Sequence, residues 1–337
     1  MQVRMKDIAD QLGVSVVTVS KVLRNHTDIG PATRRRVLRK VKELNYQPNW
    51  AARSLVTRKS YTIGMVLPHL RHTYYQEAYH SIAEKTAPLG YTVLIAISDE
   101  NSAAEEKEVR QMVARQVDGL ILASVRAPGD VTLLQELSER KVPYVLIDRR
   151  FRGIDAPFVG FDDRAMGVMA TEHLIQTGCT RVAHLRGPEV STSLLRLKGY
   201  QDALKRNGLP ARSSYIAGGR GDDQTGYEAM KKLLRLQPRP DGVFCYSDPL
   251  AAGAMKAVLE AGLKIPSDVA IMGCGNMHYS DLFQVPLSTI DQKSCEMGAT
   301  AAEMLLGLID SKRPPGPRTV LLSPTIVSRQ SSRSRTA

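Results

Sequence analysis

Residues 6–23 read KDIADQLGVSVVTVSKVL, and this stretch predicts two short helices joined by a tight turn. Ile8 and Leu12 recur at helical spacing along one side of the first helix. Gly13 supplies the backbone freedom with which that helix can end, and Ser15 suits the N-cap of the second. The second helix is expected to bury three apolar side chains, Val19, Val22 and Leu23.

The other face of the second helix carries side chains that suit contact with DNA. Val16, Val17, Ser20 and Lys21 are expected to point outward, although exposed valines do little to keep a helix soluble. Small apolar side chains of this kind suit a helix whose first turn enters the major groove. An ordinary pair of packed helices in a helical domain is the alternative that this stretch alone leaves open.

The distribution of charge favours DNA binding. The 337 residues carry a formal net charge of +12. Residues 1–60 hold 13 Lys and Arg against four acids, and three more Arg follow Ser328. The rest of the chain is balanced, with 30 basic and 30 acidic residues. A basic head on a neutral body is the charge pattern of a protein that binds nucleic acid phosphates.

Composition argues against several other classes of protein. No run of about 18 apolar residues predicts a membrane span, and the N-terminus lacks the apolar stretch of a secretory signal. We therefore expect a cytoplasmic, nucleoid-associated protein. No phosphate-binding loop, nucleophile elbow or metal-ligand spacing predicts a cofactor, a metal or enzymatic activity. The cysteines are too widely spaced for a metal site or a disulfide framework: Cys179, Cys245, Cys274 and Cys295.

Residues 32–44 predict a third helix, and Pro31 suits its first turn. Its spacing places four apolar side chains inward, Val37, Leu38, Val41 and Leu44. Outward basic side chains, Arg34 among them, can reach phosphates, and a solvated basic face is the alternative for about half of them. We assign residues 1–48 to a helix-turn-helix headpiece.

Residues 49–59 predict a hinge between this headpiece and the rest of the chain. The stretch NWAARSLVT, residues 49–57, begins with an N-cap Asn and contains Ala52 and Leu55. A helix this short is marginal in water, so we expect it to form only against a partner helix and DNA. A plain linker is the alternative.

From residue 60 the chain alternates buried strands and helices, which is typical of doubly wound α/β folds with parallel sheets. A first unit has expected strands at 61–67, 92–98, 119–124 and 143–148, and helices at 75–89, 103–116 and 131–140. A second unit has expected strands at 181–185, 215–217, 242–246 and 270–273, and helices at 166–177, 193–207, 225–236 and 250–261. A helix at 295–311 and a strand at 319–323 follow.

Two similar units predict a two-lobed core, residues 60–337, whose cleft closes on a ligand at the carboxyl ends of the strands. Residues 329–337, rich in Ser and Arg, are expected to form a flexible basic tail. We assign the first lobe to about 60–162 and 292–322, and the second to about 163–291 and 323–328.

A family resemblance rests on motifs that run in order through the chain. GVSVVTVSKVLRN (13–25), NYQPNWAARSLVT (45–57) and YTIGMVLP (61–68) come first. Further motifs follow, VLIDRR, VGFDDRAMG, HLIQTGCTRVAHLRGP, RLKGYQDAL, DGVFCYSDPLAAGAMKAV, IPSDVAIMGCGN and VPLSTIDQ. Together they resemble the lactose-repressor (LacI–GalR) family of bacterial transcription regulators, over essentially the whole chain.

The resemblance implies a repressor whose core has the periplasmic-binding-protein-like fold. It also implies a homodimer on double-stranded operator DNA, with headpieces in successive major grooves and paired hinge helices in the minor groove. A small-molecule effector between the two lobes, a sugar or sugar derivative, would control the affinity for the operator.

The resemblance also implies which residues meet DNA. Val16, Val17 and Lys21 match base-reading positions, and Lys21 departs from the Arg common there, which loses the bidentate fork for guanine. Leu55 matches the leucine that wedges between central base pairs, and Ala52 the residue packed beside it. The full set of expected DNA contacts is Ser15, Val16, Val17, Thr18, Ser20, Lys21, Asn25, Arg34, Ala52 and Leu55.

By position, the effector would meet an aromatic pair, several carboxylates and one Arg, which together suit a polyhydroxylated ring. Each has an ordinary alternative: Asp248 can cap a helix, Asp148 can orient Arg149, and Ser124 can be core. The expected effector contacts are Tyr74, Tyr75, Ser124, Asp148, Asp162, Arg196, Ser247, Asp248 and Asn276.

Three departures from the family pattern bear on the ligand. Gly275 replaces a common Asp, Gly221 a stacking aromatic of some relatives, and Val190 a basic residue of purine-sensing relatives. A purine is therefore disfavoured, and a larger or less polar ligand, or control by a protein cofactor, is an alternative to a sugar. A solute-binding receptor would explain the lobes but not the basic headpiece.

Overall fold

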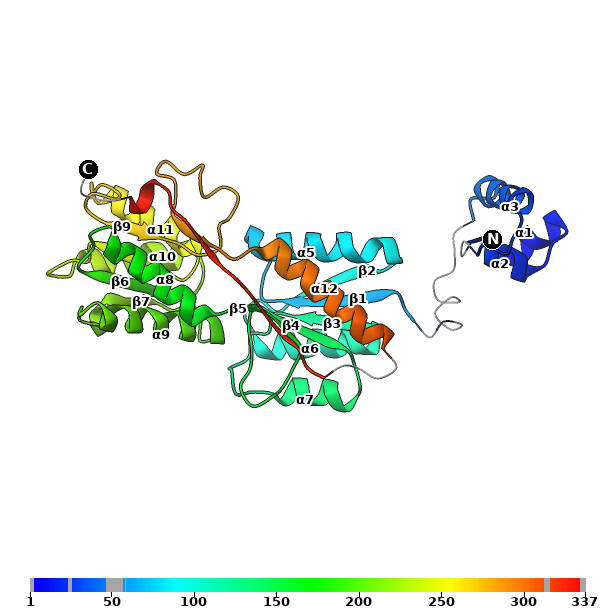
Figure 1. The fold of residues 1–337 in the computed structure, drawn as a ribbon, viewed down its shortest axis with the longest axis horizontal. Coiled ribbons are helices and arrows are strands. Elements are labelled where there is room, and N and C mark those ends of the chain that lie inside the picture. Colours follow the sequence, from blue (N-terminus) through cyan, green and yellow to red (C-terminus); the bar gives the residue numbers. More distant parts are fainter. Residues whose placement is uncertain (1–2, 24–25, 47–56, 58, 312–315, 334–337) are drawn as a thin grey trace. The chain divides into compact units, whose positions relative to one another are not determined.

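The chain folds into two compact units, Met1–Ser60 and Tyr61–Ala337, in a computed structural model (Figure 1). The structure describes residues 3–23, 26–46, 57, 59–311 and 316–333. Most of the predicted hinge, including Ala52 and Leu55, lies outside the described residues, as does Asn25.

The N-terminal unit packs helices α1 (Met5–Leu12), α2 (Val16–Leu23) and α3 (Pro31–Glu43) around one small core. Gly13 ends α1 with a left-handed φ of 63°, as its position predicted. The core comprises Ile8, Ala9, Val19, Val22, Val37 and Tyr46. Leu38 was expected inward but is 46% exposed, because the helix turns it away from the face that Val37 occupies.

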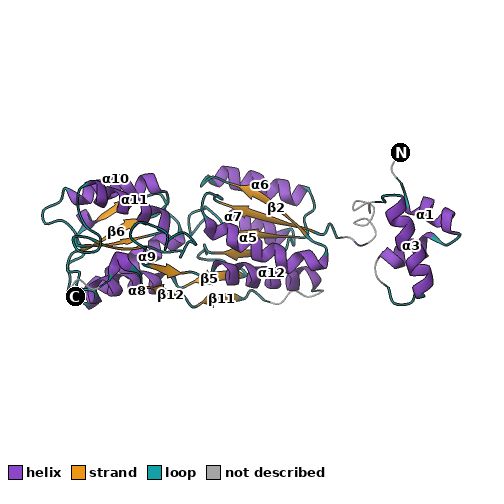
Figure 2. Cartoon of the chain, turned by 90° about the horizontal axis from the view of Figure 1, so that it is seen from above, coloured by secondary structure: helices purple, strands orange, loops and turns teal. Residues whose placement is uncertain are grey.

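The first lobe of the core unit is built on a parallel sheet with the order β11-β5-β4-β3-β1-β2. Its strands are β1 (Thr62–Leu67), β2 (Thr92–Ile97), β3 (Gly119–Leu122), β4 (Tyr144–Ile147), β5 (Phe158–Phe161) and β11 (Thr319–Leu322). Helices cover both faces of this sheet (Figure 2), which makes it doubly wound. The helices are α5 (Thr73–Thr86), α6 (Ser102–Ala114), α7 (Thr132–Glu139) and α12 (Ser294–Asp310).

The second lobe repeats this plan with a parallel sheet of order β7-β6-β8-β9. Its strands are β6 (Val182–Arg186), β7 (Ile216–Gly218), β8 (Gly242–Cys245) and β9 (Ala270–Met272). Its helices are α8 (Asp163–Gln176), α9 (Ser191–Arg206), α10 (Asp223–Leu234) and α11 (Asp248–Glu260). Helices α8 and α9 approach closely because Gly199 has no side chain: a Cβ there would lie 2.1 Å from the carbonyl oxygen of Arg164.

The end of the chain ties the lobes together. After β11 it forms β12 (Thr325–Val327), which pairs antiparallel with β10 (Thr289–Asp291). A short 3₁₀ turn, Gln330–Ser332, then buries Ser331 and Ser332 completely. The Ser331 hydroxyl accepts from Ser288 N and donates to the carbonyl of Ile271. The expectation of a flexible tail from residue 329 is therefore wrong as far as residue 333, because backbone groups of the second lobe satisfy these polar side chains.

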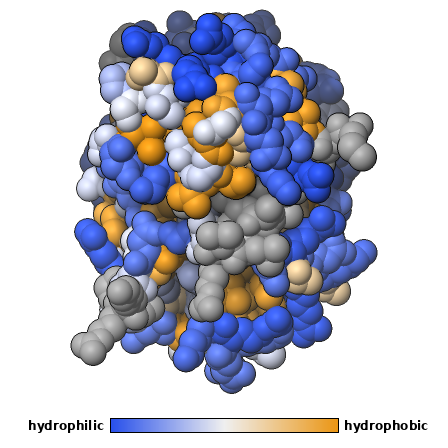
Figure 3. All heavy atoms as spheres, turned by 90° about the vertical axis from the view of Figure 1, so that its right-hand side faces the viewer, coloured by the Kyte–Doolittle hydropathy of each residue, from blue (hydrophilic) through white to orange (hydrophobic). Residues whose placement is uncertain are grey.

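Strand β2 also differs from its prediction. It was expected to be buried on both faces, but it lies at the edge of the sheet and leaves Leu94 and Ile97 37% and 39% exposed. Strand β5 and the β10–β12 pair were not predicted, because three- and four-residue strands carry little periodic signal. No helix in the described part of the chain is long and apolar enough to span a membrane. On the face drawn in Figure 3, hydrophobic side chains show as separate patches among hydrophilic ones.

Candidate functional site

A cavity of about 340 Å³ lies between the two lobes of the core unit. Most of its lining comes from segments that directly follow strands β1, β2, β4, β6, β7, β8 and β9. Carboxyl ends of parallel strands meet at one edge of a sheet, so both sheets present these segments to the same space. The volume is within the usual range for small-molecule sites.

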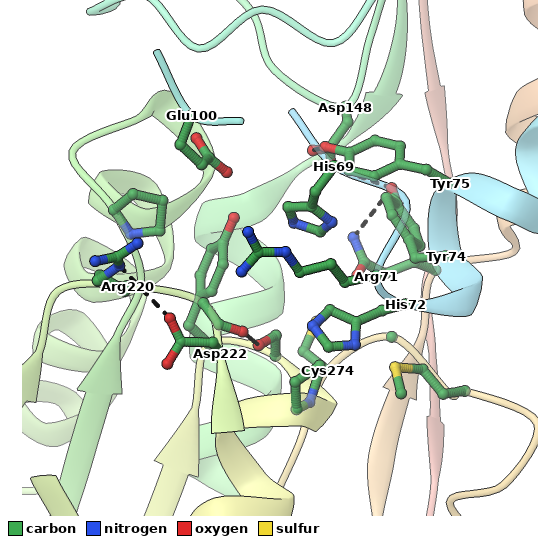
Figure 4. Close-up of a pocket in the computed structure, with 18 of the residues that line it drawn as sticks. His69, Arg71, His72, Tyr74, Tyr75, Glu100, Asp148, Arg220, Asp222 and Cys274 are labelled. Atoms are coloured by element: carbon green, nitrogen blue, oxygen red, sulfur yellow. Dashed lines mark hydrogen bonds and ion pairs between the residues drawn. The ribbon is translucent and has the colours of Figure 1, made fainter. Parts of the chain in front are cut away.

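The first lobe contributes an aromatic pair anchored on a carboxylate (Figure 4). Tyr74 and Tyr75 donate from their hydroxyls to the two oxygens of Asp148, at 3.0 and 2.8 Å. Burial raises the pKa of both phenols well above 10, so they remain protonated donors. Their rings lie 5.0 Å apart at 66°, and this arrangement leaves a rigid aromatic wall beside the cavity.

The second lobe contributes Arg196, which is 3% exposed. Its Nε donates to Asp163 at 2.9 Å and its Nη1 to the carbonyl of Tyr246 at 2.7 Å. Its guanidinium also lies 4.7 Å from the centre of the Tyr246 ring. Burial raises the pKa of Asp163 to about 7, against the opposing effect of Arg196. Arg196 also lines the cavity, and no hydrogen bond from its Nη2 to a described residue is present.

Charged side chains line the rest of the cavity. Arg71 pairs with Asp99 at 2.8 Å, and Arg149 donates to both oxygens of Glu100 at 3.0 and 2.8 Å. In the second lobe Arg220 lies 3.5 Å from Asp222. The imidazoles of His69 and His72, on the first-lobe segment between β1 and α5, also line the cavity (Figure 4), and burial lowers the pKa of each, which favours the neutral form.

The structure brings together five of the nine predicted effector residues. Tyr74, Tyr75, Asp148, Arg196 and Ser247 all line the cavity. Each follows a strand or faces the cleft from α9, as the predicted topology required.

The other four predicted effector residues do not line the cavity and have structural partners instead. Ser124 donates to Glu105 in the first lobe, and Asp162 caps α8 by accepting from Ala165 N at 2.9 Å. Asn276 accepts from Arg329 at 2.8 Å. Asp248 is completely buried, and its oxygens accept from Met277 N, Ser280 and Thr289.

Sequence reasoning missed the immediate neighbours of several predicted residues. Arg149 follows Asp148, Tyr246 precedes Ser247, and the segment 69–72 precedes the aromatic pair. Position directly after a predicted strand was the signal that would have found them. The missed lining residues are His69, Arg71, His72, Asp99, Glu100, Arg149, Pro188, Arg220, Asp222, Tyr246, Pro249, Cys274, Met277 and Gln292; Gly221 and Gly275, which the sequence singled out as departures from the family pattern, also line the cavity.

A second site lies on the N-terminal unit, on the first turn of α2. Val16 and Val17 are 41% and 64% exposed. Ser15 caps the helix, since its hydroxyl accepts from Thr18 N at 3.0 Å and lies 2.9 Å from the Thr18 hydroxyl. Lys21 is half-exposed, and its ammonium group pairs at 2.5 Å with the carboxylate of Asp28, in the loop that precedes α3. The first turn of α2 thus presents apolar side chains with a cation one turn further along.

Two other predicted DNA residues are partly engaged within the unit. Ser20 is half-buried on α2. Arg34 donates from Nη2 to the carbonyl of His26 and so fixes the loop that precedes α3. A guanidinium held in this way can still face a phosphate with its remaining donors.

Comparison with known proteins decides the family. Residues 4–49 match bacterial regulatory proteins of the lacI family, and residues 171–332 match a periplasmic binding protein-like domain. Over 309 residues the chain is 32% identical to catabolite control protein A of Priestia megaterium, covering 90% of this chain and 92% of that protein. The chain belongs to the lacI family of bacterial regulatory proteins. This regulator is a DNA-binding transcriptional repressor and not an enzyme.

Other relatives and structures agree with this assignment. The regulator is 32% identical to the HTH-type transcriptional repressor CytR of Escherichia coli, over 90% of its own length and 88% of that protein. A crystal structure of the lac repressor dimer, bound to operator and an anti-inducer, matches 99% of this chain and 100% of that one with a TM-score of 0.87 and 25% identity. The regulator thus has the lac repressor fold, which in that crystal structure is a dimer bound to operator DNA.

Proposed function

We propose that this regulator reads its operator with the first turn of α2 and responds to a small polyhydroxylated molecule in the cavity between its lobes. The observation that carries the first half is the exposure of Val16 and Val17 on a capped helix, with Lys21 one turn on. Apolar side chains at the start of a recognition helix meet thymine methyl groups in the major groove. The regulator would therefore work on the nucleoid.

The cavity supports the second half of the proposal. Tyr74 and Tyr75 offer an aromatic wall, while Asp148, Ser247 and Nη2 of Arg196 offer polar groups for hydroxyls. A solved relative, 28% identical and with a TM-score of 0.74, is the regulator CelR in complex with cellobiose. A sugar or sugar derivative is the ligand class that this equipment fits best.

The glycine positions in the lining favour a ligand larger than one sugar ring. A Cβ at Gly221 would meet nothing closer than the Tyr246 ring, at 3.8 Å, and a Cβ at Gly275 nothing closer than Asp248, at 3.7 Å. Where relatives place a bulky or acidic side chain, this cavity is open. Asp248 does not replace the missing carboxylate, because its oxygens already accept three hydrogen bonds within the lobe.

The test starts with selection of duplexes from a random pool by the full-length protein. We expect enrichment of a two-fold symmetric site, and loss of selectivity at one or two base pairs per half-site for the double variant Val16→Ala and Val17→Ala. Binding of random duplex should persist in that variant, because phosphate contacts supply it. Identical enrichment by variant and parent would remove α2 from the reading role.

Ligands are then screened by thermal shift against sugars, sugar acids and nucleosides, and each hit is tested for its effect on operator affinity. A coupling of about 1–3 kcal/mol predicts a change of roughly 5- to 150-fold. Arg196→Gln and the milder Tyr74→Phe should weaken the ligand response, whereas Arg206→Gln, at the exposed end of the same helix, should not. A response that survives both cavity variants would place the ligand elsewhere.

A further inference from the structure

The structure contains a second cavity, of about 390 Å³, that shares no lining residue with the first. It lies among the loop between β4 and β5, the first turns of α9 and the segment that enters β11. Successive residues of one loop serve the two cavities: Asp148 and Arg149 line the effector cavity, whereas Arg150 and Arg152 line the second. The two sites are therefore separated by a few residues of main chain.

The arginines of the second cavity have no carboxylate partner among the described residues. The main-chain N–H of Arg150 donates to the hydroxyl of Ser191 at 3.1 Å. The main-chain N–H of Arg152 donates to the carbonyl of Pro128 at 2.7 Å. Both side chains are exposed and form no ion pair with the residues that the structure describes. Asp155 is the one acidic residue of the lining. In contrast Arg149, the preceding residue, is buried and held by Glu100.

The floor of this cavity is apolar. Leu146 and Phe158 are 1% and 3% exposed and belong to a core cluster of the first lobe. Phe151 and Ile154 pack against that cluster from the loop, and α9 adds Leu194, which is 37% exposed. An apolar floor under two uncompensated guanidinium groups suits a molecule with an anionic end and an apolar body.

We propose that this second cavity binds a small phosphate ester whose body is apolar, with Arg150 and Arg152 holding the phosphate. Guanidinium groups present planar pairs of donors that match phosphate oxygens, and two of them balance a dianion better than a carboxylate. The Ser191 hydroxyl, at the first residue of α9, lies in the same lining and can donate to a phosphate oxygen.

A ligand in the second cavity would also act electrostatically on the effector cavity. Asp163 pairs with Arg196 of that cavity at 2.9 Å, and the charge of Arg150 acts on the same carboxyl, since it lowers its pKa. A phosphate bound to Arg150 would offset this charge and raise the pKa of Asp163 further, which favours its neutral form and weakens its pairing with Arg196. This coupling rests on the proposed function, but the binding itself does not.

The binding is tested by isothermal titration of the full-length protein with phenyl phosphate, and with phenol, benzoate and inorganic phosphate as comparison compounds. We expect saturable binding of phenyl phosphate and much weaker binding of phenol, which lacks the anion. Each of Arg150→Gln and Arg152→Gln should weaken binding by about tenfold or more, the usual loss for a hydrogen bond to a charged group. Arg115→Gln removes the same charge at the end of α6, outside both cavities, and should not change it.

Three results with phenyl phosphate would overturn the proposal. They are the absence of saturable binding at millimolar phenyl phosphate, an equal loss in Arg115→Gln, and a loss in Arg220→Gln but not in the second-cavity variants. The last result would place the phosphate in the effector cavity, because Arg220 is an exposed residue of that lining. Tighter binding of benzoate than of phenyl phosphate would replace the phosphate by a carboxylate and so also refute it. Operator selection is measured separately, so failure here leaves the proposed function standing.

Discussion

Acid should destabilise the second lobe through His184, a completely buried histidine in β6. The imidazole is stacked between Tyr200 and Phe244, with ring centres 5.4 and 4.8 Å away, and Nδ1 lies 3.0 Å from the carbonyl of Phe244. Nε2 is buried without a hydrogen-bond partner among the described residues. Burial lowers the pKa of this histidine to about 3, against the opposing effect of its hydrogen bond to the carbonyl of Phe244.

The sign of the effect follows from this lowered pKa. The unfolded chain binds a proton at a pKa of about 6.5, whereas the folded chain does not until far lower pH. The stabilisation is therefore complete above pH 6.5 and is lost progressively as the pH falls toward 3. Between pH 7.5 and pH 5.0 this one group should remove about 2 kcal/mol from the free energy of unfolding.

Urea unfolding of the parent and of His184→Phe at these two pH values measures the effect. The variant keeps an aromatic ring between its neighbours but cannot titrate, so its own loss between pH 7.5 and 5.0 should be smaller by about 2 kcal/mol. This difference of differences does not depend on how much the substitution itself costs at neutral pH. Equal losses in parent and variant would show that His184 is not a buried neutral group.

Three further predictions concern other parts of the chain. Asp28→Asn should free Lys21 from its 2.5 Å ion pair and so tighten binding to random duplex. In a filter-binding titration the slope of log affinity against log salt should steepen by about one unit, and an unchanged slope would count against this role of Lys21. Arg329→Ala should cost about 1–3 kcal/mol in urea unfolding, since Asn276 and Leu287 lose their donor, whereas the exposed Arg333→Ala should cost little. Asp148→Asn should weaken the response to any ligand that binds the effector cavity, measured by thermal shift, because Tyr74 then loses its carboxylate acceptor; an intact response would contradict the anchoring role.

Local patterns were sufficient for most elements of the fold, although not for the short strands β5, β10 and β12. Gly13 and Ser15 mark the turn between α1 and α2, and both act there as their conformational preferences require. The buried runs of the core predicted parallel strands because such strands are covered by helices on both faces. The exception, β2, reads as buried but lies at an edge, and sheet order is not encoded in any single strand.

The position of the effector cavity could be predicted from the topology, but not which polar side chains line it. Residues after strands had to meet in one cleft, and Tyr74, Asp148 and Ser247 do. Which polar side chain faces the ligand depends instead on partners far away in the chain. Asp248 does not line the cleft, because its carboxylate accepts hydrogen bonds from Thr289, 41 residues later, and from Met277 N and Ser280.

By itself, the sequence determined the headpiece, the paired α/β lobes and the edge of the sheets at which the effector cavity lies, because these follow from apolar spacing and chain direction. Only the tertiary structure decided which charged side chains are paired with a carboxylate and which are not. Arg149 and Arg150 are adjacent and chemically identical, yet Glu100 holds the first while the second lines another cavity without an ion pair among the described residues. The reason is physical: a charge is satisfied by what lies near it in space, and those groups come from segments that sequence spacing does not bring together.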